Sequence, residues 1–258
     1  MDDVLLEKDG PLGWLILNRP EKRNALTLEM MSQVLQKLDT VARDEAIRVL
    51  VIRGNGPIFS AGHDLNEMAS RRDDLHHIRA IFEVCNRMML RLHELPQPVI
   101  AQVHGIATAA GCQLVAACDL AIAESGARFA TPGVHIGLFC TTPMIPLVRV
   151  VGRRRAMDML LSGRFISAEE ALSFSLINRV VVPDQLLAET RTWALELARF
   201  SRFTLALGKR AFYEQIDLDE KSAYAYAKEV IATNCRAEDA AEGMNAFLEK
   251  RKPQWRDR

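Results

Sequence analysis

Apolar residues recur along this chain in two patterns, short unbroken runs and stripes with helical spacing. Short runs of mostly apolar, often β-branched residues occupy 13–17, 49–52 and 98–103. Such runs are typical of strands that are buried within a sheet. Between them, apolar residues recur every three or four positions over 28–41 and 75–92, which predicts amphipathic helices. This alternation of strands and helices predicts an α/β core.

Polar residues mark where several of these helices begin and end. Thr27 and Asp74 directly precede the two apolar stripes, where a side-chain oxygen can accept a hydrogen bond from the first helical turn. Ser167 and Glu170 have the spacing of a capping box, which predicts a helix running on to residue 177. Gly163 predicts the end of the helix before it.

The last third of the chain has only helical patterns. Apolar stripes over 186–198, 203–216, 221–233 and 237–251 predict successive helices. These stripes contain more apolar residues than one layer of helices could cover, so we expect contacts between subunits. We divide the chain into an α/β core over 1–200 and a helical region over 201–258 that mediates oligomerisation.

Composition excludes several classes of protein. The 258 residues are 49% hydrophobic and 26% charged, which is typical of a globular protein. The 33 basic and 33 acidic residues balance, so nothing attracts the chain as a whole to nucleic acid or an anionic membrane. The five cysteines are scattered and no Cys/His spacing suits a metal, so we expect buried thiols and no metal ligands. The first residues are acidic and lack an apolar core, and we therefore expect a cytoplasmic location.

The first candidate site lies at residues 104–119, after the strand at 98–103. The strand ends at Gly105, a helix is expected to begin near Ala109, and only small residues and one Ile lie between them. Free N–H groups of a first helical turn can hold an anion or a developing oxyanion. The alternative is that small residues merely let the helix pack tightly against the sheet.

The second candidate site has the same construction. The strand at 48–53 runs into a glycine-rich turn over 54–64, which ends in Ser60-Ala-Gly-His-Asp64 before a helical segment at 65–70. Two strand exits of this kind can bracket a single carbonyl oxygen with backbone N–H groups.

At these two turns the chain resembles the enoyl-CoA hydratase/isomerase superfamily, the crotonases. Its signatures are an Ala-Gly-x-Asp turn, here at Ala61 to Asp64, and a glycine-rich turn that opens a helix before a Cys-Asp pair, here Cys118 and Asp119. The resemblance extends from residues 17–26 to residues 243–253. Residues 61–64, 129–134 and 137–143 are similar to the branch that contains enoyl-CoA hydratase domain-containing protein 3.

The resemblance implies a fold, a ligand and an assembly. The fold would be a crotonase-like spiral of repeated strand-turn-helix units with a helical C-terminal region. The ligand would be an acyl-CoA, with no cofactor beyond the coenzyme A moiety of the substrate. The assembly would be a homotrimer or a dimer of trimers.

The same resemblance implies roles for particular residues. The thioester carbonyl would accept hydrogen bonds from the backbone N–H groups of His63 and Ala110. The coenzyme would be held by residues of three separate segments: Lys22, Arg23, Ala25, Ser60, Ala61 and Lys250. Without the resemblance, the basic residues would be interpreted as ordinary solvated surface.

The chain departs from the family where hydration needs two carboxylates. The two glutamates that usually share the proton transfers fall on Gln113 and Gly133, which can neither accept nor donate the required proton. If residues 133–135 are extended, His135 faces the same side as Gly133 and could serve as the base. The alternatives are that His135 is satisfied by neighbouring backbone and that the His63 side chain simply packs against its turn.

Two functions therefore stay open. The first is an acyl-CoA enzyme of the enoyl-CoA hydratase/isomerase type with doubtful hydratase activity, or one that catalyses isomerisation, decarboxylation or thioester hydrolysis. The second is a non-catalytic acyl-CoA-binding or regulatory protein. A dinucleotide-binding fold entered at residues 54–56 is disfavoured because the third glycine of its fingerprint is absent.

Overall fold

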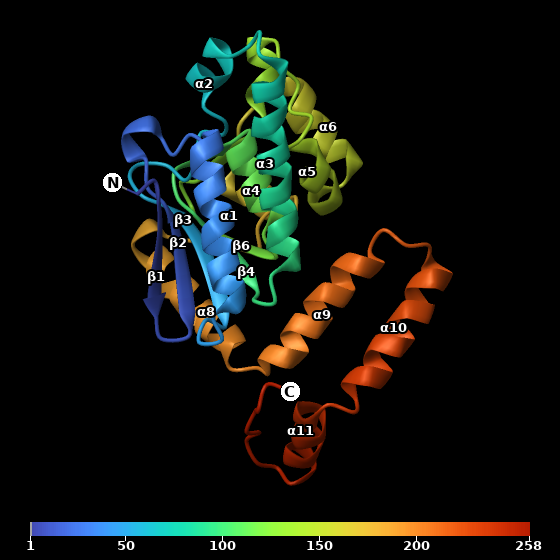
Figure 1. Cartoon of the computed structure of the whole chain (residues 1–258). Helices are drawn as coiled ribbons and strands as arrows, with labels where there is room; N and C mark the ends of the chain where they lie inside the picture. Colours follow the sequence, from blue (N-terminus) through green and yellow to red (C-terminus); the bar gives the residue numbers. More distant parts are fainter. Residues whose placement is uncertain (1) are drawn as a thin grey trace.

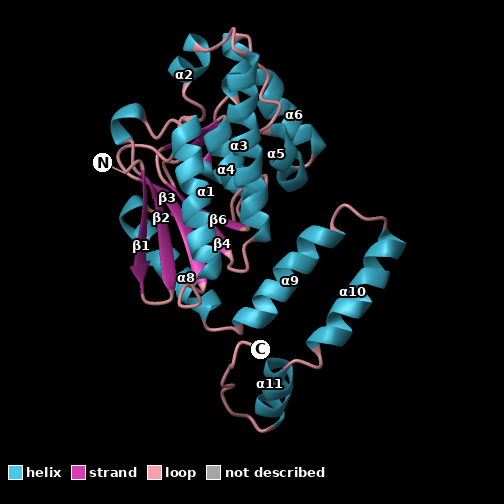
Figure 2. Cartoon of the chain, in the orientation of Figure 1, coloured by secondary structure: helices cyan, strands magenta, loops and turns pink. Residues whose placement is uncertain are grey.

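A computed structural model describes residues 2–258 and contains two sheets (Figures 1 and 2). The larger sheet has the strand order β1-β2-β3-β4-β6-β9 and is parallel except for the β1–β2 pair. The smaller sheet has the order β5-β7-β8. The strands are β1 (Val4–Asp9), β2 (Leu12–Leu17), β3 (Val49–Gly54), β4 (Val99–Val103), β5 (Ile106–Thr108), β6 (Leu120–Glu124), β7 (Arg128–Ala130), β8 (Ile166–Ser167) and β9 (Arg179–Val181). The predicted α/β fold is confirmed.

Helices cover both faces of the larger sheet. Helices α1 (Leu28–Arg43), α3 (Leu75–Glu94) and α4 (Ala110–Ala117) lie on one face, and α8 (Leu186–Ala198) lies on the other (Figure 1). Leu50 and Ile52 of β3 belong to the apolar cluster on the first face, whereas Val49 and Val51 belong to the cluster under α8. Both side-chain directions of the central strands are therefore buried, which explains their unbroken apolar runs.

The predicted helix ends are largely confirmed. Thr27 and Asp74 cap α1 and α3 by accepting hydrogen bonds from Met30 N and His77 N. Ser167 and Glu170 form the reciprocal capping box, although the helix they begin, α7 (Ala168–Ser173), is shorter than predicted. Other connecting helices are η1 (Pro20–Lys22), α2 (Leu65–Ser70), η2 (Pro132–Ile136), α5 (Met144–Val151), α6 (Arg153–Ser162) and η3 (Pro183–Gln185).

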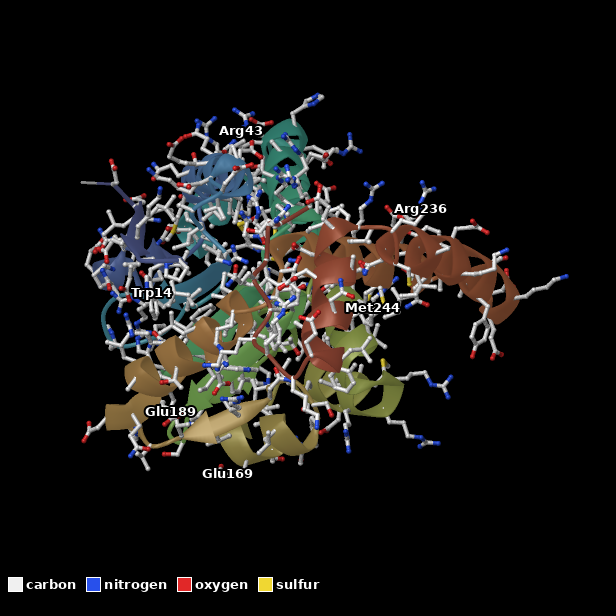
Figure 3. All side chains as sticks on the ribbon, turned by 90° about the horizontal axis from the view of Figure 1, so that it is seen from below. Trp14, Arg43, Glu169, Glu189, Arg236 and Met244 are labelled. Atoms are coloured by element: carbon white, nitrogen blue, oxygen red, sulfur yellow. The ribbon has the colours of Figure 1, made fainter. Side chains whose placement is uncertain are left out.

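The last three helices form an arm that projects from the core. We use this name for residues 202–248, which comprise α9 (Arg202–Gln215), α10 (Glu220–Asn234) and α11 (Glu238–Leu248). Figure 1 shows α10 and α11 clear of both sheets, and Figure 3 shows Arg236, which follows α10, across the picture from Trp14 of β2. The division proposed at residues 200 and 201 falls directly before α9.

A buried ion pair fastens α9 to the core. Lys209 Nζ lies 2.7 Å from Asp119 Oδ2 and also donates to the carbonyl oxygens of Leu92 and Gln97. The Tyr213 hydroxyl donates to the other carboxylate oxygen of Asp119 at 2.8 Å. Asp119, the second residue of the family's Cys-Asp pair, is therefore an anchor for the arm.

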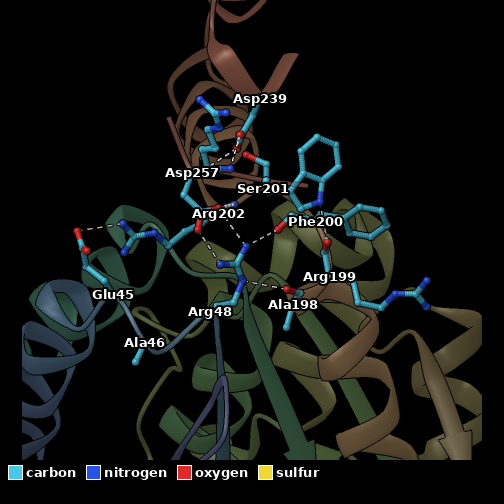
Figure 4. A network of polar contacts seen from close by, with 12 residues as sticks. Glu45, Ala46, Arg48, Ala198, Arg199, Phe200, Ser201, Arg202, Asp239 and Asp257 are labelled. Carbon is cyan, nitrogen blue, oxygen red and sulfur yellow. Dashed lines mark hydrogen bonds and ion pairs between the residues drawn. The ribbon is translucent and has the colours of Figure 1, made fainter. Parts of the chain in front are cut away.

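A second network fastens the base of the arm (Figure 4). Arg48, which directly precedes β3, forms a bidentate pair with Asp257 at 2.7 and 3.1 Å and donates to Ala198 O. Asp257 also accepts a hydrogen bond from Arg202 N, at the start of α9, while Asp239 of α11 accepts from Asp257 N. The end of the chain thus returns to the point where the arm begins.

Candidate active site

The two glycine-rich turns lie against one another. Ser60 N donates to Ile106 O at 3.1 Å, and Thr108 N donates to Ser60 O at 3.0 Å. Gly62 has φ +90°, and a Cβ there would lie 2.8 Å from Ala109 Cβ and 3.0 Å from Ala110 N. A Cβ on Gly111 would lie 2.5 Å from Ser60 O. Only glycine permits this approach, which places His63 beside the start of α4.

The approach leaves two backbone N–H groups that have no acceptor among residues 2–258. Leu26 bonds to the residues on either side of His63, since Leu26 N donates to Gly62 O and Asp64 N donates to Leu26 O. In such a parallel bridge the N–H of the central residue points away from the partner strand. Ala110 opens α4, so its N–H has no intrahelical acceptor. Within residues 2–258, neither the His63 nor the Ala110 N–H donates a hydrogen bond.

This pair of donors can stabilise negative charge on a carbonyl oxygen. The residue before Ala110, Ala109, has φ 49° and ψ −118°, a conformation that a residue with a Cβ adopts only where the surroundings impose it. Strain of this kind is common where backbone is arranged for function. Tight packing accounts for the small residues at this turn, and the two backbone N–H groups are a further feature that packing alone does not require.

The imidazole of His63 is enclosed and neutral. Its ring meets Phe82 of α3 edge-on, with centroids 5.1 Å apart. Burial lowers the pKa of His63 to about 4, so the ring is uncharged near neutral pH. Its Nε2 atom is buried without a hydrogen-bond partner in the part of the chain that the structure describes.

Gln113 lies one helical turn after Ala110 and is only 3% exposed. The Cys85 thiol, on α3, approaches its Oε1 atom at 3.9 Å. Burial raises the pKa of Cys85 to about 12, so this neighbour also stays uncharged. Gln113 can hold a water or a ligand oxygen here, but it cannot remove a proton.

Gly133 lies in η2, so residues 133–135 are not extended and the condition under which His135 would face the same side as Gly133 is not met. A Cβ on Gly133 would lie 2.8 Å from Leu138 O and 3.0 Å from Cys140 Sγ. The space into which a side chain would project is therefore filled by the returning chain. Burial raises the pKa of the Cys140 thiol, so it offers no thiolate.

His135 is directed away from Gly133. Its Nε2 atom lies 2.9 Å from Ser162 O, and the ring packs against Gly163 at the end of α6. Because a 3-10 turn does not alternate its side chains as a strand does, the two residues do not face the same side. This arrangement matches the alternative in which neighbouring backbone satisfies the histidine.

Asn24 holds the loop that contains Lys22, Arg23 and Ala25 against the turn at residues 54–64. We use the name coenzyme loop for residues 22–25, because the resemblance implies that they contact the coenzyme. Its buried amide nitrogen donates to the carbonyl oxygens of Asn55, Ile58 and Phe59. Ala61 N donates to Arg23 O at 3.0 Å. Lys22, Arg23 and Ala25 are thereby brought beside Ser60 and Ala61, with both basic side chains exposed.

Lys250 does not join this group within one chain. It lies two residues after the end of α11, and Figure 1 shows α11 and α2 at opposite ends of the molecule. Lys250 is exposed, so it is free to contact another molecule.

Residues 2–258 contain neither a cluster of metal ligands nor a membrane-spanning helix. Among them, no group of three or more His, Cys, Asp or Glu side chains could hold a metal ion. No helix there has both the length and the apolar character that crossing a bilayer requires.

Known proteins share both sequence and fold with this chain. The family model for enoyl-CoA hydratase/isomerase matches residues 8–258. A Danio rerio protein named enoyl-CoA hydratase domain-containing protein 3, mitochondrial, is 44% identical over 98% of this chain and 87% of its own length. Crystal structures of a Mycobacterium smegmatis enoyl-CoA hydratase and of human enoyl Coenzyme A hydratase domain-containing protein 3 both have a TM-score of 0.95. They are 45% and 40% identical to this chain, cover 98% of it, and are themselves covered over 98% and 100%.

These relatives contradict the expected cytoplasmic location. The Danio rerio protein and its counterparts of the same name from Mus musculus and Homo sapiens are named mitochondrial, which points to mitochondria instead. The expectation rested on the composition of the first residues of this sequence, and that composition alone does not determine the location.

The resemblance first seen at the two turns is confirmed by a family match over almost the whole chain and by two crystal structures with the same fold. The relatives named above also confirm its similarity to the branch of domain-containing protein 3. This chain belongs to the enoyl-CoA hydratase/isomerase family, the crotonases.

Proposed function

We propose that this protein binds acyl-CoA thioesters and polarises the thioester carbonyl with the N–H groups of His63 and Ala110. The observation that carries the proposal is the pair of backbone donors, adjacent and without acceptors among residues 2–258. Backbone donors are already fixed in position, and one such donor contributes about 3 kcal/mol to an oxyanion-like transition state. Lys22, Arg23, Ala25, Ser60 and Ala61 form the surface for the coenzyme.

We assign it as an enzyme of the enoyl-CoA hydratase/isomerase type whose hydration step is slow. Positions 113 and 133 supply no carboxylate, and His135 bonds to backbone elsewhere. General acid–base groups contribute about 100-fold to 10,000-fold each, whereas the oxyanion hole is a separate contribution. The alternative is a non-catalytic acyl-CoA-binding or regulatory protein, for which the same missing carboxylates are the support.

The proposal includes a homotrimer or a dimer of trimers. Lys250 would then reach the coenzyme phosphates bound to a neighbouring subunit, because within its own chain it is remote from the coenzyme loop. Support comes from the projecting arm and from its exposed apolar side chains, such as Phe247 and Leu248.

The binding test is calorimetry with butyryl-CoA, a saturated thioester that cannot be hydrated. We expect binding that weakens at higher salt and on Lys250→Ala, since salt screens contacts with phosphate. Lys252→Ala, two residues further on, is the matched control. Undetectable binding to the wild type would refute the proposal under either of its two forms.

The turnover test is hydration of crotonyl-CoA. We expect a rate far below the value of about 10 per second that is typical of enzymes. Gln113→Glu should raise kcat much more than it changes KM, because the new carboxylate acts in the transition state. A wild-type rate of typical size would show that another residue is the base, and no turnover of any acyl-CoA tested would favour the binding protein.

A further inference from the structure

The imidazole of His63 ends in a polar atom for which residues 2–258 provide no partner. Its Nε2 atom is fully buried and makes no hydrogen bond within that range. Buried polar atoms are nearly always paired, and an unpaired one carries the cost of its desolvation. Such an atom beside an oxyanion hole indicates that a ligand supplies the missing partner.

The His63 imidazole and the Gln113 carboxamide are both in contact with α3, which indicates what the imidazole faces. Phe82 and Cys85, three residues apart on α3, contact His63 and Gln113 respectively. Residues with this spacing lie on one face of a helix. The imidazole and the carboxamide therefore lie along the same strip of α3. Gln113 is also one turn beyond Ala110, so the two polar side chains belong to the residue of one proposed donor and to the helix that the other proposed donor opens.

We propose that His63 is a specificity-determining residue, whose Nε2 atom forms a hydrogen bond with a hydroxyl group on the acyl chain close to the thioester. This inference rests on the proposed function, since it names the acyl-CoA class that the site prefers. A hydroxyl group both donates and accepts, so it satisfies Nε2 in either tautomer of a neutral imidazole. Gln113, with an acceptor and two donors on its amide, can bond to the same hydroxyl.

A charged substituent fits this place less well. The imidazole is held neutral by its burial, and the neighbouring Cys85 thiol and Gln113 carboxamide are also uncharged. A carboxylate placed among these groups would lose its hydration without gaining a cation. An unsubstituted acyl chain would leave Nε2 unpaired, and sites built to bond a hydroxyl discriminate against ligands that lack it.

The test compares the affinities of butyryl-CoA and of (R)- and (S)-3-hydroxybutyryl-CoA by calorimetry. We expect the wild type to bind one hydroxylated enantiomer about tenfold more tightly than butyryl-CoA, the effect of one additional hydrogen bond. In His63→Leu this ratio should fall to about one, and His63→Gln, which restores a polar amide, should recover part of it. His76→Leu, at an exposed histidine on α3, is the matched control and should keep the wild-type ratio.

A second measurement does not depend on a variant that folds. In protein labelled with ¹⁵N-histidine, the Nε2 resonance of His63 should shift with the preferred hydroxybutyryl-CoA and not with butyryl-CoA. An unchanged Nε2 resonance, or equal affinities in the wild type, would overturn the inference while leaving acyl-CoA binding established. Failure of all three thioesters to bind would instead refute the proposed function.

Discussion

At the scale of single residues, the site depends on how closely two turns approach through Gly62. Its φ of +90° and the 2.8 Å distance from a Cβ there to Thr108 O make any side chain costly. We expect Gly62→Ala to destabilise the fold by about 1–3 kcal/mol through overpacking and to weaken butyryl-CoA binding about tenfold. The measurements are urea unfolding and calorimetry.

Gly10 offers a control that separates backbone strain from collision. It also has a positive φ, of +58°, but a Cβ there would meet nothing within 4 Å. Gly10→Ala should therefore cost only the strain of a left-handed alanine, about 1 kcal/mol, and should not alter binding. Equal effects on binding from both substitutions would contradict the role assigned to the approach of the turns.

His63 makes stability depend on pH in a definite direction. Its pKa is about 4 when folded and about 6.5 when unfolded, so between these values the unfolded chain binds the extra proton. The contribution of neutral His63 to the free energy of unfolding is complete above pH 6.5 and is lost as the pH falls towards 4. At pH 5 we expect the free energy of unfolding to be about 2 kcal/mol lower than at pH 7. His63→Leu should remove this difference.

The check is urea unfolding of wild type, His63→Leu and His76→Leu at both pH values and one protein concentration. His93 also has a pKa lowered by burial, but it is common to all three proteins and cancels. If wild type and His63→Leu lose the same stability between pH 7 and pH 5, the imidazole is not shielded as described.

Sequence alone could suggest the two backbone N–H groups that we propose as donors, but not the surroundings of Gly133. His63 and Ala110 follow from a motif in which donors belong to the main chain, so side-chain identity hardly matters. What Gly133 faces depends on a 3-10 turn that brings Leu138 and Cys140 back upon it. No periodicity reports such a return. Because the chain returns onto Gly133, Gly133→Glu would require Leu138 and Cys140 to move.

At the scale of elements, the attachment of α9 depends on the Asp119–Lys209 pair. Lys209 is almost fully buried, and its burial lowers its pKa while Asp119 opposes that shift. Lys209→Met would leave the Asp119 carboxylate without a cation, at a cost of about 3–5 kcal/mol for breaking a buried pair. Faster hydrogen exchange over residues 202–215 should report the loosened helix.

Lys228→Met is the matched control, because Lys228 is exposed on α10 and pairs with its neighbour Glu229. Exposed pairs contribute about 0–1 kcal/mol, so little change is expected. Exchange in α9 that is equally unaffected by both substitutions would show that apolar packing alone holds the arm.

Elements with strong local signals were predicted well, and those that depend on partners were not. Helices α1 and α3 have capping residues and long apolar stripes. Strand β1 lies at the sheet edge with one neighbour and carries Glu7 and Lys8 on its exposed positions, so it lacks the apolar run of a central strand. Strand β9 has only three residues, which is too short for any period to appear.

At the scale of the whole molecule, the arm presents an apolar surface that the chain itself does not cover. Phe247 and Leu248 are 83% and 77% exposed, and an open groove between α9 and α10 is lined by Phe212 and Ile231. Large exposed apolar patches are typical of interaction surfaces. The proposed trimer or dimer of trimers would bury this surface.

We expect light scattering to give about three or six times the 28.9 kDa chain mass. Phe247→Asp with Leu248→Asp should lower it, because two buried carboxylates without partners would oppose association. Leu65→Asp, at an exposed leucine on α2, is the control. A wild-type mass of 28.9 kDa at micromolar concentration would rule out the oligomer.

The contacts at the base of the arm also have an optical consequence. Of the three tryptophans, Trp14 and Trp193 are buried in the cluster beneath α8, whereas Trp255 donates from Nε1 to Arg199 O and lies against Gly243 of α11. Trp255 is only half-buried, so acrylamide can reach its indole more readily than the other two. Fluorescence quenching of the unlabelled protein would follow rotation of the arm about its base while the emission of the core stayed constant.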